Sequence, residues 1–398
     1  MKIKVGVIFG GESVEHEVSI ITAVQAMEHM DQNKYDIVPI YVSKDRTWYT
    51  GKMLMEMDVY RDFDTLKRYA KKVMLVKTET GFFLQSTKGL FHRNVAELDI
   101  AFPIVHGKGA EDGSLAGFLD FIGIPYVGCN VLGAALGQDK VVQRQLMELN
   151  QIPVPKYTWF YDSEYLMDSA RIVKEVKKIG YPVIVKPAKL GSSIGISIAT
   201  STKELDKCIT EAITYDNKII IEQVIPNLLE VNCSVFGNYE YQETSQLAEM
   251  LTKNQFLTFD DKYLSGGKGK TKMGMKTSAK MSTSEMVIPA RISKNIEQKV
   301  RNLSIQTFRT LNLAGTVRID FLINRETDEV YVNEPNTIPG SLAFYLWRDM
   351  KDYTTLLDDM ITSTIRDYKN ANKKTTSFDS NILSTFNGSK GMKSKLRS

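Results

Sequence analysis

Residues 315–340 read GTVRIDFLINRETDEVYVNEPNTIPG, and this stretch predicts a β-hairpin. Two segments with alternating apolar residues flank the polar turn RETD, as in antiparallel strands joined by a short loop. Side chains alternate between the faces of a strand, so Arg318 and Asp320 share one face, as do Glu334 and Asn336 on the partner strand. Folding at the turn sets residue 334 roughly opposite residue 320. One patch of sheet then holds a cation, two carboxylates and an amide.

This patch is suited to a divalent cation. Carboxylate and amide oxygens are the ligands that Mg²⁺ prefers, and Mg²⁺ commonly binds through one or two carboxylates together with substrate phosphates. The alternative is a solvated hairpin with alternating charges. That alternative does not explain the proline-glycine turn at residues 339–340, which would aim backbone amides at the same place. We therefore predict a magnesium site on the hairpin.

A second segment, YPVIVKPAKLGSSIG at residues 181–195, predicts a phosphate-binding loop. Lys186 ends an apolar strand, and the two glycines and two serines that follow could wrap phosphate oxygens with backbone N–H groups. The lysine precedes the glycines and the loop returns into a strand, unlike a P-loop. This order favours a lid over a triphosphate, with an ordinary hairpin loop as the alternative. Lys140, at the start of an expected helix, is a candidate second phosphate cation.

Two further segments could contact a charged substrate. FGGESVEHEVS at residues 9–19 leaves a strand and opens a helix, where Glu15 could hold an ammonium group or could simply cap the helix. Residues 256–280 are rich in glycine and lysine, which predicts a mobile loop. Its lysines could close over a polyphosphate, and a charged surface loop is the alternative.

The pattern along the chain predicts several domains in 398 residues. Strands alternate with helices over the first ~135 residues, which favours an α/β fold with a parallel sheet and helices on both faces. Two prolines at 153 and 155 mark a stiff connection, followed by a small α+β lobe that includes the strand EVNCSVFG at 230–237. The expected units are an N-terminal α/β substrate domain, a central lobe with the lid, a C-terminal lobe with the metal site, and a basic tail expected to be disordered: 1–138, 139–238, 239–370 and 371–398.

Composition narrows the class of protein and its partners. Hydrophobic residues at 43% and charged residues at 25% indicate a folded chain. Three cysteines, no signal-peptide pattern and no apolar run of membrane-spanning length predict a cytoplasmic location. The net charge of +4 includes +6 from residues 369–398, so the remaining chain carries −2. We therefore expect neither nucleic acid nor a membrane as a partner.

Taken together, these segments resemble the D-alanine–D-alanine ligases of the ATP-grasp superfamily. The resemblance covers residues 1 to about 368 and rests on GGESVEHEVS, HGKGAEDGSLAG, KPAKLGSSIG, DKY, RIDF and NEPNTIPG. It implies an ATP-grasp fold with an N-terminal parallel-sheet domain. In such enzymes ATP phosphorylates the first D-alanine, the amine of the second attacks the acylphosphate, and the product enters peptidoglycan synthesis. It also implies two Mg²⁺ ions, with Mn²⁺ as a possible substitute, D-alanine as donor and expected acceptor, and a homodimer.

The resemblance also implies roles for particular residues. Those expected to bind ATP are Lys140, Lys186, Ser193, Glu222, Glu230 and Lys262. The expected metal ligands are Asp320, Glu334 and Asn336. Glu15 and His106 would hold the first substrate, and Arg318 with the Gly340 amide would stabilise the tetrahedral oxyanion. Ser192, Tyr263 and Glu15 would form a hydrogen-bonded link between lid, loop and substrate.

The acceptor site departs from the family pattern. Relatives usually carry a Ser-Leu pair after the NTIPG turn, whereas this chain places Tyr345 and Leu346 there. Tyr345 would then bind the carboxylate of the second substrate, or Ser341 would supply the donor instead. A related ligase that uses D-serine is an open alternative, and the DKY motif argues against D-lactate. A catalytically silent nucleotide-binding regulator is disfavoured, because the metal set on the hairpin is complete.

Overall fold

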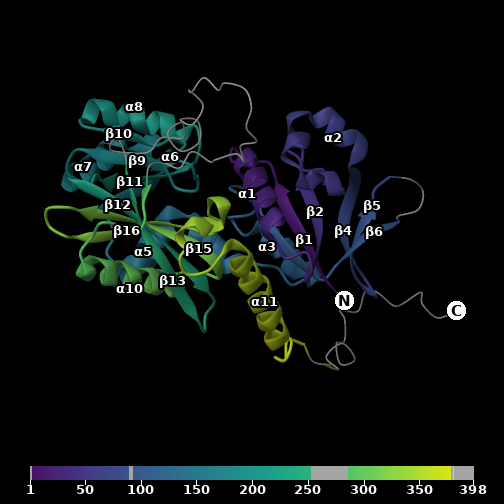
Figure 1. Ribbon diagram of the computed structural model, residues 1–398. Helices are drawn as coiled ribbons and strands as arrows, with labels where there is room; N and C mark the ends of the chain where they lie inside the picture. The colour runs from purple at the N-terminus through teal and green to yellow at the C-terminus, as the bar shows by residue number, and fades with distance from the viewer. Residues whose placement is uncertain (1, 89–92, 252–285, 378–379, 381–398) are drawn as a thin grey trace, which may run out of the picture.

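The computed structural model describes residues 2–88, 93–251, 286–377 and 380, and within these ranges the chain forms three β-sheets (Figure 1). The loop at 256–280 and most of the basic tail, both singled out in the sequence, lie outside the described residues, as do Lys262 and Tyr263. None of the described helices combines the length and apolar character needed to span a membrane.

The N-terminal sheet has seven strands in the order β6-β5-β4-β3-β2-β1-β7. The strands are β1 (Ile3–Gly10), β2 (Tyr35–Val42), β3 (Trp48–Thr50), β4 (Lys71–Thr78), β5 (Gly81–Ser86), β6 (Asn94–Leu98) and β7 (Ile100–Ile104). Only β1, β2 and β7 pair in parallel, and β3 to β6 extend the sheet with antiparallel pairs. The expectation of a parallel sheet therefore holds only for the three strands β2, β1 and β7 at one end of this sheet, and the other strands are joined by antiparallel pairing, which needs only short turns.

Helices cover both faces of the three parallel strands, as expected. Val7 and Phe9 of β1 pack on the side of α1 (His16–His29), while Ile8 faces Leu119 of α3 (Ser114–Ile122). The elements η1 (Lys52–Met55), η2 (Met57–Arg61) and α2 (Phe63–Tyr69) complete this region. The next two helices, α4 (Val131–Gln138) and α5 (Lys140–Leu149), lead to another part of the molecule, where Leu136 and Met147 pack in a different core. Because β1 and β7 are parallel neighbours, the loops that follow them lie side by side at one edge of the sheet.

The second sheet forms a small lobe with a core of its own. Its order is β10-β9-β11-β8, made of β8 (Tyr157–Tyr161), β9 (Val183–Pro187), β10 (Ser197–Ala199) and β11 (Lys218–Gln223). The helices α6 (Asp162–Met167), α7 (Ser169–Ile179) and α8 (Thr202–Ile213) pack on it. The loop between β9 and β10 is the predicted lid.

The third sheet carries the predicted hairpin. Its order is β14-β13-β12-β15-β16, made of β12 (Leu228–Gly237), β13 (Gln242–Met250), β14 (Met286–Val287), β15 (Gly315–Asn324) and β16 (Val330–Asn336). We expected the strand at 230–237 in the central lobe, and this was wrong: β12 pairs with β15 along its whole length. A strand pattern predicts a strand but not which sheet it joins, because that depends on distant partners.

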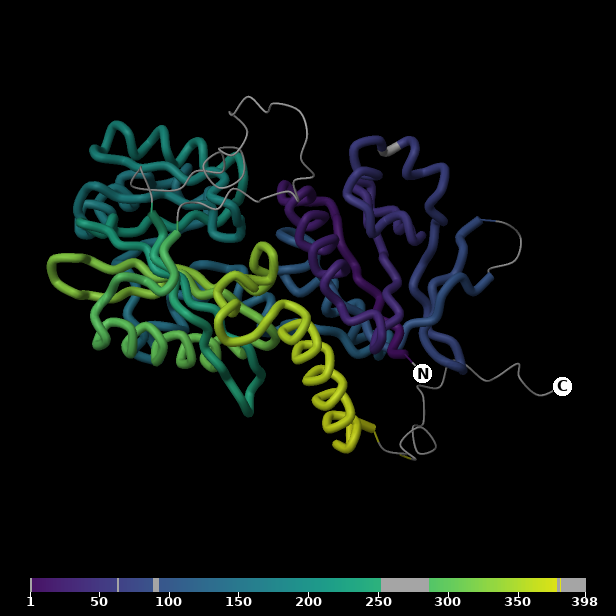
Figure 2. Tube along the Cα trace, viewed as in Figure 1, coloured from purple at the N-terminus to yellow at the C-terminus, as the bar shows by residue number. Residues whose placement is uncertain are grey.

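The last described helix packs back onto the N-terminal sheet. After α10 (Lys294–Thr310) and the hairpin come η4 (Gly340–Leu346) and α11 (Tyr353–Ala371). Figure 2 shows α11 running beside α1, and Trp347, Leu357 and Met360 share one buried cluster with Val7 and Phe9. This packing places the turn at residues 339–343 against α1.

Candidate active site

The β15–β16 hairpin has the predicted register. Asp320 pairs with Glu334 and Arg318 with Asn336, so all four residues lie across one patch. The Arg318 guanidinium donates to both oxygens of Asp320, from Nε at 2.7 Å and from Nη2 at 2.9 Å. Asn336 donates from Nδ2 to Asp320 at 3.1 Å. This hydrogen bond involves the side-chain nitrogen of Asn336 and not its side-chain oxygen. The alternation inferred from the sequence is confirmed here.

Lys140 connects the hairpin to the lid. Its Nζ lies 3.2 Å from Glu334 Oε2 and donates to the backbone oxygen of Leu190 at 2.7 Å. Lys140 is the first residue of α5, and Asp139 caps that helix by accepting from two backbone N–H groups. The helix start therefore aims a buried ammonium group at the junction of metal patch and lid.

The patch fits a divalent cation bound together with an anion. Each carboxylate already faces one cation, Arg318 on Asp320 and Lys140 on Glu334. Among the described residues no three His, Cys, Asp or Glu side chains form a group that could hold a metal, and the predicted set has only two carboxylates and one amide. Such a set leaves coordination positions for phosphate oxygens, which is how Mg²⁺ is commonly held beside a nucleotide.

A buried charge network surrounds Lys186, the other lysine predicted to bind phosphate. Glu222 on β11 faces Lys186 on β9, with Nζ 2.6 Å from Oε2, and Arg144 on α5, with Nε 2.7 Å from Oε1. Burial opposes the carboxylate charge, but Arg144 and Lys186 outweigh it and hold the pKa of Glu222 at about 2. Lys186 Nζ also donates to Asn333 at 3.4 Å. The structure thus brings Lys186 and Glu222 together, and Lys186 links this network to the hairpin through Asn333.

Arg144 was not singled out in the sequence. It lies one helical turn after Lys140, on the same side of α5, and this spacing was the available signal. Glu230 on β12 is half-buried beside the strand that carries Asp320.

The lid reaches the start of α1. Ser192 donates a hydrogen bond to Glu15, and Ser192 and Ser193 both adopt left-handed backbone angles, with φ of 53° and 60°. A Cβ atom on Gly191 would lie 3.2 Å from Glu15 Oε2, so glycine permits this close approach. Two members of the predicted lid–loop–substrate link are therefore in contact, and the third, Tyr263, lies outside the described residues.

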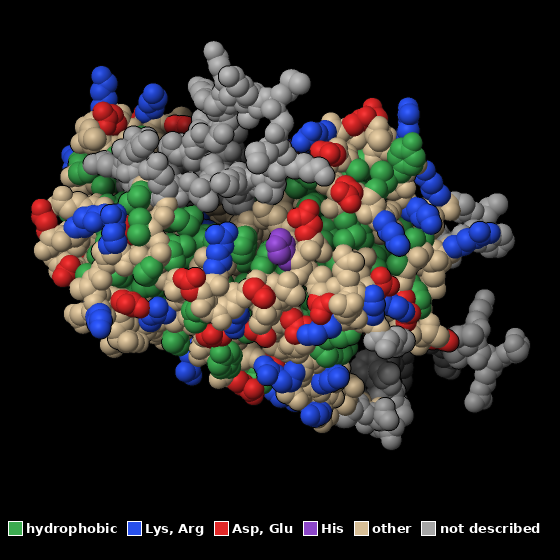
Figure 3. Space-filling model, in the orientation of Figure 1, with side chains coloured by type: hydrophobic (Ala, Val, Ile, Leu, Met, Phe, Trp, Pro, Cys, Tyr) green, Lys and Arg blue, Asp and Glu red, His purple; other side chains and the backbone are tan. Residues whose placement is uncertain are grey.

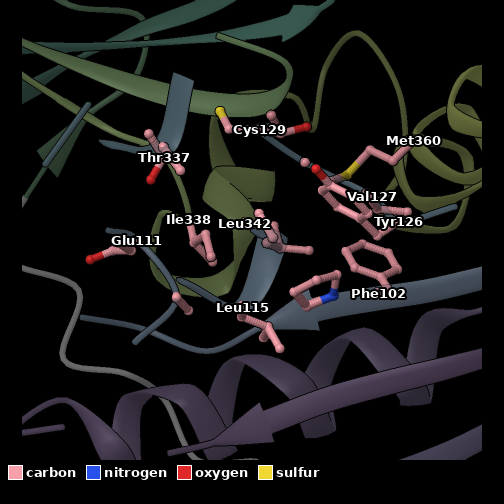
Figure 4. A pocket seen from close by; sticks show the side chains of 16 residues that line it. Phe102, Glu111, Leu115, Tyr126, Val127, Cys129, Thr337, Ile338, Leu342 and Met360 are labelled. Atoms are coloured by element: carbon pink, nitrogen blue, oxygen red, sulfur yellow. The ribbon is translucent and has the colours of Figure 1, made fainter. Parts of the chain in front are cut away.

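Glu111 is a second acid at this junction that sequence reasoning missed. It belongs to the quoted HGKGAEDGSLAG segment, and its Oε2 accepts from the Gly107 N–H at 2.9 Å. Burial, followed by the nearby charge of Glu15, raises the pKa of Glu111 to about 8. It borders a cavity of about 30 Å³ whose other lining includes Ile338 and Leu342 (Figure 4). This cavity is large enough for about one water molecule, not for an amino acid.

The predicted acceptor turn has an unusual backbone. Ser341, Leu342 and Ala343 follow Gly340 with φ near +50°, in the left-handed region. The Arg318 guanidinium donates a hydrogen bond to the Tyr345 hydroxyl, so the phenol reaches the candidate oxyanion cation. Leu346 is fully buried in the core, so the structure does not bring it to the site.

Ser341 and His106 are both engaged with α1. Ser341 Oγ donates to Gln25 Oε1 at 2.7 Å, and His106 Nε2 lies 3.3 Å from Thr22 Oγ1. Burial, and then the charge of Arg318, lower the pKa of His106 to about 4. His106 is therefore neutral near pH 7, and it does not carry a charge to a substrate.

Comparisons with known proteins show the family to which this chain is similar. The family model described as D-ala D-ala ligase N-terminus matches residues 4–129, and the one described as D-ala D-ala ligase C-terminus matches residues 146–362. A D-alanine–D-alanine ligase of Thermosipho melanesiensis is 38% identical over 386 residues, which cover 96% of this chain and 98% of the relative. A D-alanine–D-alanine ligase of Caldicellulosiruptor bescii is 34% identical, with 95% and 98% covered.

Solved structures show the same architecture. The VanG D-Ala:D-Ser ligase from Enterococcus faecalis is 28% identical with a TM-score of 0.74, over 92% of this chain and all of that one. The D-alanine-D-alanine ligase from Coxiella burnetii has a TM-score of 0.76 over 94% of this chain and 96% of that one, and at 24% identity it shows the shared fold alone. Because both family models and full-length relatives above 30% identity match, the chain belongs to the D-alanine–D-alanine ligase family.

Proposed function

We propose that this protein joins two D-alanine molecules to D-alanyl-D-alanine at the expense of ATP, through a D-alanyl phosphate, for peptidoglycan precursor synthesis. The observation that carries the proposal is the register of the β15–β16 hairpin, which sets Asp320 opposite Glu334. Lys140 joins this carboxylate pair to the lid, and the lid contacts Glu15. Metal ligands, phosphate cations and a substrate-binding acid then surround one place, as carboxylate phosphorylation requires.

The nucleotide would be held by the cations and by the hairpin. Lys140 and Lys186 would bind its phosphates under the lid, with Ser193 and neighbouring amides closing over them. Glu222 and Glu230 would contact the nucleoside, and Lys262 would lie near the phosphates. Asp320, Glu334 and the Asn336 carbonyl would hold Mg²⁺, or Mn²⁺ in its place. The metal supplies charge stabilisation for the transferring phosphoryl group.

The two amino acids would be handled by different groups. Glu15 would hold the ammonium group of the first D-alanine, oriented by Ser192 and, in the closed site, by Tyr263. Arg318 and the Gly340 amide would stabilise the oxyanion that forms when the second amine attacks. Tyr345 would meet the acceptor carboxylate from its position on Arg318.

Two findings favour D-serine as an alternative acceptor. The 28% identical VanG structure is that of a D-Ala:D-Ser ligase, and the Tyr345 position differs from the family's serine. A phenol can donate the same hydrogen bond from further out. D-serine is therefore the alternative acceptor to test, ahead of D-lactate.

The proposal includes a cytoplasmic homodimer without nucleic-acid or membrane partners. All three cysteines are free thiols, which suits a reducing compartment. Acidic and basic side chains are interspersed over the face shown in Figure 3, which gives no field of one sign for nucleic acid. The apolar side chains Phe121 and Leu132, which are 93% and 56% exposed, offer a surface for a second copy of the chain.

One experiment tests the function directly. The purified full chain is given ATP, Mg²⁺ and D-alanine, then D-alanine with D-serine or D-lactate, and product masses are read. Formation of D-alanyl-D-alanine with stoichiometric ADP supports the proposal. A mixed D-Ala-D-Ser product formed in preference would favour the alternative, and nucleotide binding without any ligation would indicate a silent regulator. Sedimentation of the same sample reports the oligomeric state.

A further inference from the structure

Thr22 lies between the two predicted substrate subsites. It is a fully buried residue of α1, and its Oγ1 accepts a hydrogen bond from the Ser341 N–H at 3.1 Å. The same oxygen lies 3.3 Å from His106 Nε2. One hydroxyl group therefore contacts both the acceptor turn and the residue predicted at the first substrate.

The hydrogen bonds around Thr22 have a defined direction. The Ser341 N–H can only donate, so the hydroxyl accepts there and retains its own proton. His106 is neutral near pH 7 and bonds to the backbone of Ile338. A neutral imidazole has one donor and one acceptor nitrogen, so with N–H directed at the Ile338 carbonyl, Nε2 accepts from Thr22. A chain of hydrogen bonds thus runs from Ser341 through Thr22 and His106 to Ile338. It connects both ends of the Ile338–Ser341 turn to α1.

The backbone conformation of this turn has to be stabilised by its neighbours. Three consecutive residues without glycine's freedom adopt left-handed angles at 341–343, and each costs conformational energy that neighbouring contacts must offset. Gln25, one turn after Thr22 on α1, receives the Ser341 hydroxyl at 2.7 Å. These contacts set the direction of the Gly340 amide and the path of the chain to Tyr345.

We propose that Thr22 is a positioning residue, which through the Ser341 amide holds the turn that presents Gly340 and Tyr345 to the acceptor, and through Nε2 fixes the tautomer of His106. The kinetic part of this inference rests on the proposed ligase function. The part concerning His106 does not. Both parts require the hydroxyl group rather than the bulk of the side chain.

The test compares Thr22→Val, which keeps the shape and removes the hydroxyl, with Thr22→Ser, which keeps the hydroxyl. Thr50→Val is the matched control: Thr50, on β3 of the neighbouring sheet, is another buried threonine, and its Oγ1 donates to the Pro39 oxygen at 2.7 Å. We expect Thr22→Val to lower kcat/KM for the acceptor by about tenfold, through KM, kcat or both. The KM for ATP should stay within about twofold of wild type. Thr22→Ser and Thr50→Val should stay near wild type.

The second readout is ¹⁵N NMR of the histidine rings in the full chain, which has only four histidines. A His106→Gln sample assigns the His106 signals. In wild type Nε2 should show the shift of an unprotonated, hydrogen-bonded nitrogen, and this shift should change in Thr22→Val and return in Thr22→Ser.

The outcomes separate the two proposals. If wild-type protein ligates no D-amino acid, the proposed function fails and the NMR comparison alone decides the role of Thr22. An unchanged His106 signal in Thr22→Val overturns the inference. Equal kinetic losses in Thr22→Val and Thr22→Ser, or a loss shared with Thr50→Val, overturn it as well.

Discussion

Replacement of Glu222 by glutamine tests how the buried charge network is held together. The Glu222 side chain is 1% exposed, and its partners Arg144 and Lys186 are 0% and 7% exposed. Glutamine keeps the volume but removes the one negative charge that both cations face. Breaking a buried ion pair in this way commonly costs about 3–5 kcal/mol, because the remaining charge stays buried. We expect the free energy of unfolding to fall by that amount at pH 7.

The stability that the Glu222 charge contributes can also be calculated from its pKa. Its folded value of about 2 lies below the ordinary value of 4.5, so the folded state binds the proton less well than the unfolded state. The corresponding stability, about 3 kcal/mol, is fully present above pH 4.5 and is lost as the pH falls towards 2. The difference between wild type and Glu222→Gln should therefore shrink between pH 4.5 and pH 3.

Urea unfolding followed by circular dichroism at pH 7 and pH 3 measures both effects. The control is Glu12→Gln, which removes an exposed ion pair with Arg46, with side chains 53% and 71% exposed. That change should cost less than about 1 kcal/mol. A loss below 1 kcal/mol in Glu222→Gln at pH 7, or the same loss at both pH values, would refute the reasoning.

Four other predictions concern residues of the site. Glu334→Gln should abolish ligation with an unchanged circular dichroism spectrum, because a metal ligand is lost at constant volume, and near-normal turnover at saturating Mg²⁺ would contradict this. Arg318→Met should reduce kcat by about a hundredfold or more through loss of oxyanion stabilisation, so steady-state kinetics showing a change in KM alone would assign it to ground-state binding. Tyr345→Phe should raise the acceptor KM about ten- to a hundredfold, whereas an unchanged value, with the loss appearing in Ser341→Ala, would move the donor to Ser341. Because the pKa of His106 is lowered to about 4, its burial costs stability as the pH falls from 6.5 towards 4, and in urea titrations His106→Gln should lack this part of the pH dependence.

The parts of the fold that follow local rules could be predicted from the sequence. The register of Asp320 and Glu334 follows from strand alternation and a short turn, and both are encoded within 26 residues. The antiparallel half of the N-terminal sheet was missed, although β4 and β5 are separated by only Glu79 and Thr80. Apolar residues run consecutively in both strands, as VMLV in β4 and FFL in β5, so the alternation typical of a half-buried strand is missing.

The rest of the site depends on contacts between distant segments. Arg144 matters because β11 carries Glu222 opposite α5, and nothing in the local sequence of α5 reveals that strand. The contact of Ser341 with Thr22 and Gln25 joins residues more than 300 positions apart. The placement of Leu346 likewise depends on distant segments, because it is buried in the cluster that η4 shares with the N-terminal sheet, whereas the resemblance to the family predicted it at the acceptor site.

The shared cluster between the N-terminal sheet and α11 bears on how this chain could be divided or rearranged. Apolar residues from β1, α1, β12, η4 and α11 form that one cluster, whereas the larger cluster of the second sheet draws on residues 160–221. The N-terminal sheet and the segment from η4 to α11 therefore share one core, despite their distance in sequence and the two family models that match them separately. The lid-bearing lobe is not independent of the rest, because Val141 of α5 packs on its sheet and Arg144 of α5 forms a buried ion pair with Glu222. Recombination between relatives should accordingly fail between the two ends of the chain, which share a core and must be inherited together.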